Sequence, residues 1–334
     1  MRSHIAGWHR PLLLFTAAMG VMTLVSGVGL LVDDRMLVGS PIWHKPLKFS
    51  LSFALYGLTL AWMHSLLTRW QRTSWWAGTV VVVAGMVEMV IIVGQVVRGK
   101  RSHFNTETST DAALYSLMGS TVVVLWLATL LMAVVLWREP LADRATRWGI
   151  RLGSVIGLAG LSVGILMTLP TADQSSGRIT DTAGAHGVGI TDGGPHLPVT
   201  GWESTGGDLR VAHFVGMHAL QVLPLLALAL TSAARRYGWA ADTGVRPRLV
   251  LVAGFGYAGL VGLTMWQALR GQALTSPDAL TLGAAGALAA AVAVAAGLVL
   301  LIGAARGRGG SAGPGAAAGP AARAGAPADA GAGG

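Results

Sequence analysis

Residues 88–105, EMVIIVGQVVRGKRSHFN, join an acidic side chain inside an apolar stretch to a polar cluster at its end. Glu88 is the only carboxylate within the long apolar runs of the chain, and an ionised carboxyl group at that depth costs roughly 3 kcal/mol or more unless it is paired. On a helix, Glu88 and Gln95 share one face, and Arg98 lies within the same broad arc. This spacing predicts the wall of a polar pocket in which Glu88 is a proton-active, catalytic group.

A polar rim follows this stretch at the expected membrane surface, where Gly99 frees the backbone. The rim consists of Lys100, Arg101, Ser102, His103 and Asn105.

A second polar stretch is GDLRVAHFVGMHALQVLP, residues 207–224. Arg210 and His213 fall on one stripe of its helix, whereas His218 lies about 140° further round. We therefore do not expect His213 and His218 to bind one ion from an unbroken helix.

Imidazole nitrogens at this level would suit a haem, such as haem b, or a transition metal in a redox role. The expected ligands are His103 and either His213 or His218, although none of the spacings is a diagnostic ligand signature. The chain has no cysteine, which excludes disulfides and thiolate-bound metals. Further side chains are expected to contact the cofactor, the arginines through haem propionates: Arg98, Arg270, Gln95, Gln267 and Arg210.

A transporter or a binding protein for an anionic or lipid-like ligand is the alternative. Arg98 and Arg270 would clamp a carboxylate or phosphate, and ionisation of Glu88 would couple binding to protons. Lys45 and Lys48 are further candidate contacts to a small anionic ligand.

A membrane-embedded hydrolase or transferase is a third hypothesis, with His103 or His213 as a general base beside Ser102 or Asp208. A simpler explanation of the polar cluster also stands, because loops outside a membrane are in water and collect polar residues anyway.

The elements that must position these residues are membrane-spanning helices. Of the 334 residues, 53% are hydrophobic and only 12% are charged, and a span needs about 20 apolar residues. The sequence predicts an all-α, polytopic membrane protein with about eight transmembrane helices in a domain covering residues 1–304. The predicted spans are 12–32, 49–68, 76–98, 112–136, 149–169, 211–232, 249–269 and 279–304.

The formal net charge of +9 does not indicate nucleic-acid binding, because most Lys and Arg residues flank apolar segments, where they set orientation. The side that would carry both termini receives 15 of the 24 basic residues, and the opposite side receives 9. We therefore expect a multi-pass protein of a bacterial inner membrane, in contact with the lipid bilayer, with both termini cytoplasmic.

Three segments between or after the spans have their own character. In residues 33–49, Pro41 and Pro46 are expected to break helix, while Trp43 and the lysines suit a membrane interface. Residues 170–210 form the longest connection, and we expect a lid there. Residues 305–334, rich in Gly, Ala and Pro, predict a disordered cytoplasmic tail.

The motif Q-x-x-R-G closes two of the predicted spans. Gln95, Arg98 and Gly99 recur as Gln267, Arg270 and Gly271 at an offset of 172 residues. Since four spans preserve orientation, this repeat indicates a parallel duplication of four helices plus four.

The phrases WHKPLKF, RGKRSHFN, GDLRVAHFVGMHALQVLP and WQALRGQ resemble those of a family of bacterial polytopic membrane proteins. The resemblance covers residues 35–275 and implies no particular activity. The layout is also similar to that of haem A synthase, whose halves hold histidines on their second and fourth helices. Here the segments 112–136 and 279–304 have no histidine, so the similarity is one of layout only.

Overall fold

The computed structural model describes residues 7–310, with side chains up to residue 306. Over this range the regular secondary structure is helical, apart from four strands of two residues each. The eight long helices are α2 (Arg10–Val32), α3 (His44–Ser65), α4 (Gln71–Arg98), α5 (Ser109–Arg138), α6 (Arg144–Met167), α8 (Leu209–Ala233), α10 (Val245–Leu269) and α11 (Ala279–Gly310).

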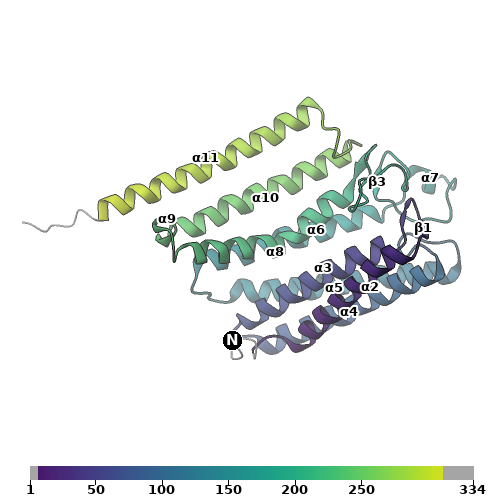
Figure 1. Ribbon diagram of the computed structural model, residues 1–334, viewed down its shortest axis with the longest axis horizontal. Helices are drawn as coiled ribbons and strands as arrows, with labels where there is room; N and C mark the ends of the chain where they lie inside the picture. Colours follow the sequence, from purple (N-terminus) through teal and green to yellow (C-terminus); the bar gives the residue numbers. More distant parts are fainter. Residues whose placement is uncertain (1–6, 311–334) are drawn as a thin grey trace, which may run out of the picture.

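Seven of these helices are long and apolar enough to cross a membrane, all but α3. The class of multi-pass membrane protein is therefore confirmed. Helix α3 has 22 residues and lies beside α2 and α4 (Figure 1). Its first turns carry His44, Lys45 and Lys48, which lower its mean hydropathy.

Helix α3 begins five residues before the predicted span, at His44 rather than at residue 49. The prediction that Pro46 breaks helix is wrong, because Pro46 falls in the first turn of α3. There the missing N–H would have had no partner within the helix. As a result, Lys45 and Lys48 lie in the first two turns of α3.

The long helices form two groups of four (Figure 1). The first half comprises α2 to α5, and the second half comprises α6, α8, α10 and α11. Within each half the first helix packs on the second and third, the second on the third, and the third on the fourth. The halves meet mainly where α5 packs on α6 and α3 on α8.

The tightest pairing joins α6 to α8. A Cβ atom added at Gly160 would lie 2.3 Å from the carbonyl carbon of Gly216, and one added at Gly216 would lie 2.6 Å from the Cα of Gly160. Only glycine permits this backbone approach, as is common between membrane helices.

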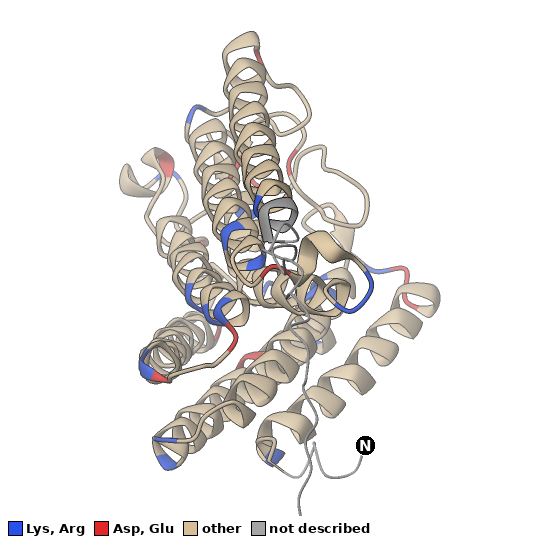
Figure 2. Cartoon of the chain, turned by 90° about the vertical axis from the view of Figure 1, so that its left-hand side faces the viewer, with Lys and Arg blue, Asp and Glu red and all other residues tan. Residues whose placement is uncertain are grey.

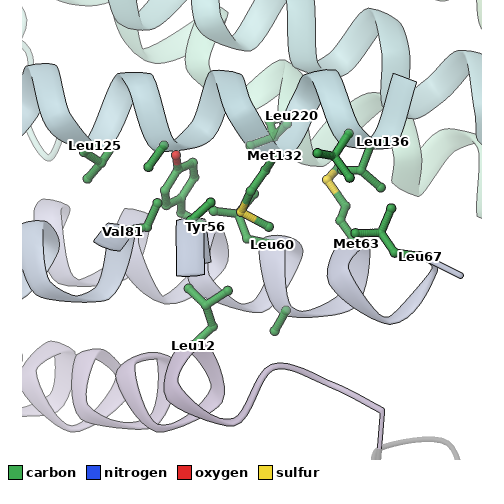
Figure 3. Close-up of a cluster of buried hydrophobic side chains, with 14 of the residues drawn as sticks. Leu12, Tyr56, Leu60, Met63, Leu67, Val81, Leu125, Met132, Leu136 and Leu220 are labelled. Carbon is green, nitrogen blue, oxygen red and sulfur yellow. The ribbon is translucent and has the colours of Figure 1, made fainter. Parts of the chain in front are cut away.

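The largest apolar core lies within the first half and reaches the second (Figure 3). Leu60 and Met63 of α3 point toward Met132 and Leu136 of α5, and Leu220 of α8 joins them from the other half. Tyr56 in this core shares a hydrogen bond with Thr129. The core therefore connects both halves through α3 and α5.

The two ends of the molecule differ in their connections. One end holds the start of α2, the short helix α9 (Gly238–Ala241) and, as Figure 2 shows, Lys and Arg at helix ends. The opposite end, here called the loop side, holds α7 (Ala172–Ser175) and four strands (Figure 1). These strands pair as β1 (Met36–Leu37) with β2 (Ser40–Pro41), and β3 (Gly187–Val188) with β4 (Gly207–Asp208).

Helix α11 continues to Gly310, so residues 305–310 of the predicted tail are helical. Residues 311–334, the rest of that prediction, lie outside the described residues.

Candidate functional site

Five side chains from both halves form a polar cluster on the loop side. This loop-side cluster consists of Lys45 of α3, Glu88 of α4, His103 of the α4–α5 connection, His186 of the α6–α8 connection and His213 of α8. His103 and Lys45 both lie beside the Phe49 ring, with the His103 centroid and the Lys45 Nζ 5.5 and 5.9 Å from its centroid. His103 and His186 both lie beside the Phe104 ring, with their centroids 6.3 and 4.9 Å from its centroid. Residues distant in sequence thus lie close enough to influence one another.

The connection between α6 and α8 covers this end of the helices. Asp181 binds Arg101, with 3.1 Å between Oδ2 and the guanidinium, and the N–H of Ala183 donates to the carbonyl of Phe104. Lys48 donates from α3 to the carbonyl of Thr200 at 2.8 Å. The segment is therefore attached to the first half, although it belongs in sequence to the second.

His186 is oriented by Asp192. The His186 Nδ1 lies 2.7 Å from Asp192 Oδ2, and the backbone N–H groups of His186 and Gly187 also donate to this carboxylate. Burial lowers the pKa of His186 despite the opposing effect of the Asp192 hydrogen bond. His186 is therefore neutral at pH 7 and donates from Nδ1. Its Nε2 keeps a free lone pair and can accept a hydrogen bond or bind a metal.

His213 is oriented by the backbone of α6. Its Nδ1 lies 2.8 Å from the carbonyl oxygen of Gly160. A carbonyl can only accept, so this nitrogen carries the proton and Nε2 is again an acceptor. The close approach of α6 and α8 at Gly160 and Gly216 positions this bond.

His103 lies among aromatic rings. Its centroid is 5.5 Å from that of Phe49 and 6.3 Å from that of Phe104, and its Nδ1 is 3.2 Å from the Oγ of Ser102. Burial lowers the pKa of His103 well below its ordinary value, and the nearby cation Lys45 lowers it further. His103 is therefore neutral, and no hydrogen bond to its Nε2 is present among the described residues.

Glu88 is 1% exposed. The hydroxyl of Thr121 on α5 donates to its Oε1 at 2.5 Å, whereas Oε2 has no partner among the described residues. A buried oxygen without a partner is costly, so this atom is the place where a proton or a ligand donor would be accommodated.

Lys45 differs from the other basic residues of the loop side. The expected topology puts nine Lys and Arg residues there, and eight of them hydrogen-bond or pair with the chain: Arg35, Lys48, Arg98, Lys100, Arg101, Arg178, Arg210 and Arg270. Within the described residues Lys45 has no such partner, and its Nζ is 5.9 Å from the Phe49 ring centroid.

The structure places Gln95 and Arg98 in a helix cap. Gln95 donates to the carbonyl of Arg101 at 3.1 Å, and Arg98 lies 2.8 Å from Asp111 at the start of α5. Gly99 adopts a φ of 68°, which glycine accommodates without strain. Gln95 and Arg98 bind each other and Asp111, so both side chains join α4 to α5.

Gln267 and Arg270 occupy the same positions at the end of α10. Gln267 donates to the carbonyl of Ala273 at 2.8 Å, Gly271 has a φ of 69°, and Arg270 pairs with Asp278 just before α11. The two Q-x-x-R-G motifs thus build one local structure twice. Neither Arg98 nor Arg270 is joined to a histidine of the loop-side cluster by a hydrogen bond.

Two other predicted site residues have nearby partners. Arg210 binds Asp208 with both its Nε and a terminal nitrogen, the latter at 2.6 Å. His218 lies further along α8, 3.3 Å from the amide oxygen of Gln221, so His213 and His218 contact different partners as their spacing predicts.

The sequence places His186 and Asp192 in the long connection between the fifth and sixth predicted spans, but none of the hypotheses gave either residue a role in the site. The only signal was an acidic residue in a turn six positions after a histidine, within a long connection. In the described part of the chain, no three His, Asp or Glu side chains come together as a group able to hold a metal ion.

Comparison with models of protein families, with curated proteins and with solved structures finds no match to this chain.

Proposed function

We propose that this chain is an eight-span protein of a bacterial inner membrane with both termini cytoplasmic. The charge distribution supports this orientation, since Lys and Arg are more numerous at the end where α2 begins. Helix α3 would be the eighth span, because it lies parallel to its apolar neighbours (Figure 1).

We also propose that the two halves arose by parallel duplication. The same order of helix packing in each half supports this, as does the repeated Q-x-x-R-G cap. The loop-side cluster would then lie on the extracytoplasmic side, where the halves approach one another.

The function we propose is binding of a small anionic ligand at the loop-side cluster, as in a transporter or a receptor. The observation that carries this proposal is the ammonium of Lys45, which forms no hydrogen bond or ion pair within residues 7–306, whereas its basic neighbours do. A half-buried cation that forms no ion pair attracts an anion, because little water screens its charge. Neutral His103 and His186 would accept hydrogen bonds from the polar groups of the same ligand.

Ligand-dependent stabilisation of the purified protein tests this proposal. A panel of small carboxylates and inorganic phosphate is added to the full chain in detergent, and thermal unfolding is followed. A ligand present at about 100 times its dissociation constant stabilises the folded state by about 2.7 kcal/mol. We expect such stabilisation in the wild type and its loss in Lys45→Met.

Lys100→Met is the matched control, because Lys100 is an exposed lysine of the same side that pairs with Glu107. This variant should respond to the ligand as the wild type does. Equal responses in Lys45→Met and the wild type would exclude Lys45 as the receiving cation.

A second candidate is a haem held by two imidazoles in a redox role. It is favoured by the orientation of His186 and His213, since both use Nδ1–H on a fixed oxygen and leave Nε2 free. Metal-ligating histidines have this arrangement. Such a haem needs only two protein ligands, and no three-ligand metal site is formed by the described residues.

The absorbance spectrum and metal content of the purified protein distinguish the two candidates. A Soret band that is lost in His213→Ala would establish haem. A colourless, metal-free preparation that is still stabilised by the anion would exclude haem and support the anion site.

A further inference from the structure

A recess lies between α10 and α11, away from the loop-side cluster. It has a volume of about 510 Å³ and is lined by apolar side chains, among them Val252, Phe255, Leu288 and Val292. Phe255 is 68% exposed, so the recess opens outward. In a membrane, this outward face contacts lipid.

The length of the groove matches one leaflet. Its lining runs from residue 248 to 256 on α10 and from 288 to 299 on α11. At 1.5 Å per residue these stretches are about 12 and 16 Å long, which is close to half of the roughly 30 Å hydrocarbon core. An occupant lying along the groove would therefore span a single leaflet.

One end of the groove carries a cation. Arg248, in the first turn of α10, lines the recess and is partly exposed. It has no hydrogen bond or ion pair among the described residues, whereas Arg246, two residues earlier, contacts Asp143 and Thr231. Arg248 is thus available to an anion at the level where α10 enters the membrane.

We propose that this groove binds an anionic phospholipid. One acyl chain lies between α10 and α11, and the phosphate group contacts the guanidinium of Arg248. Basic side chains at the cytoplasmic ends of membrane helices recognise anionic headgroups in this way. A second copy of the chain is a poorer occupant, because it would leave Arg248 facing apolar side chains without a counter-charge.

The groove does not involve Lys45 or any other member of the loop-side cluster, so this inference stands independently of the proposed ligand site. It also gives α11 a means of attachment. The most apolar 18-residue stretch of α11 has no buried residues, and a bound acyl chain would contact α10 and α11 together.

Native mass spectrometry of the full chain, released from nanodiscs of equal parts phosphatidylglycerol and phosphatidylethanolamine, tests this inference. We expect the wild type to retain phosphatidylglycerol preferentially. Arg248→Gln should reduce the ratio of retained phosphatidylglycerol to phosphatidylethanolamine about fivefold, the factor that one basic side chain near an anionic surface contributes. Arg235→Gln is the control, since Arg235 is exposed and lies outside the groove.

A second variant tests the acyl-chain part. Ala295→Phe would fill the groove from α11, and it should reduce retention of both phospholipids while the protein still elutes as a folded species. An unchanged lipid ratio in Arg248→Gln would overturn the headgroup contact. Undiminished retention in Ala295→Phe, or a dimer that this variant disrupts, would overturn the groove as a lipid site.

Discussion

Replacing Gly160 with alanine should separate α6 from α8 and disturb His213 with it. The added Cβ would lie 2.3 Å from the carbonyl carbon of Gly216, whereas carbon atoms in contact lie about 3.5–4.0 Å apart. The helices must therefore move by more than about 1 Å at this point. Overpacking of this kind costs about 1–3 kcal/mol.

Reversible unfolding in mixed micelles with increasing sodium dodecyl sulfate measures this cost. The control is Gly119→Ala, because a Cβ at Gly119 of α5 would meet nothing within 4 Å. Alanine is favoured over glycine within a helix by about 1 kcal/mol, so the control should be neutral or more stable. Both variants gain this propensity, so Gly160→Ala should be the less stable of the two by the overpacking cost of about 1–3 kcal/mol.

The functional consequence follows from the same contact. His213 donates to the carbonyl of Gly160 at 2.8 Å, so moving α6 away changes the position of the imidazole. Gly160→Ala should therefore also weaken the anion-dependent stabilisation described above. If its stability equals that of Gly119→Ala, the close approach of the two backbones is not a feature of the protein.

Three further predictions concern the polar groups. Burial lowers the pKa of His103 below its value in the unfolded chain, so the unfolded state binds more protons as the pH falls below about 6.5. Stability should therefore fall as the pH drops from 7 toward 5. His103→Gln should make this fall shallower in pH-dependent melts, and an unchanged slope would contradict the prediction. Arg98→Gln removes the cation from buried Asp111, which keeps its hydrogen bonds from Gln95 and Thr108. Because Arg98 is 41% exposed, the protein should lose about 1–2 kcal/mol of stability. Arg98→Lys should restore part of that loss, and equal melts for both variants would exclude an ion-pair role. Glu88→Gln keeps an oxygen that accepts from Thr121, so folding should stay intact. The change removes an ionisable carboxyl group whose negative charge opposes anion binding near Lys45, so anion binding should become less dependent on pH. An unaltered pH profile of binding would count against an ionising Glu88.

Local features of the sequence predicted most of the helical organisation. Seven of the eight predicted spans coincide with helices that meet the criteria for crossing a membrane, and the eighth coincides with α3. The boundary error at α3 arose because proline was treated as a helix breaker, whereas Pro46 occupies the first turn, where it is tolerated.

The candidate site was less predictable. Placing Glu88 and His103 near the same end of the helices required only the spacing of residues along one segment. The partners of Arg98 and Arg270 depended on where the next helix begins, since Asp111 and Asp278 lie there. A guanidinium expected to face a ligand also forms an ion pair with a carboxylate from a neighbouring element, and hydropathy does not report this pairing.

The sequence by itself determined that this is a helical membrane protein, because the mean apolarity of about 20 neighbouring residues is a local quantity that fixes which segments can enter lipid. It also determined the repeated Q-x-x-R-G caps, whose hydrogen bonds join residues only six positions apart. Only the tertiary structure decided that Lys45 and His103 lie beside one aromatic ring, that His103 and His186 lie beside another, and that Lys45 forms no hydrogen bond or ion pair with the residues the structure describes. Those facts depend on how the backbones of separate helices approach, as at Gly160 and Gly216, and this packing depends on many distant residues at once.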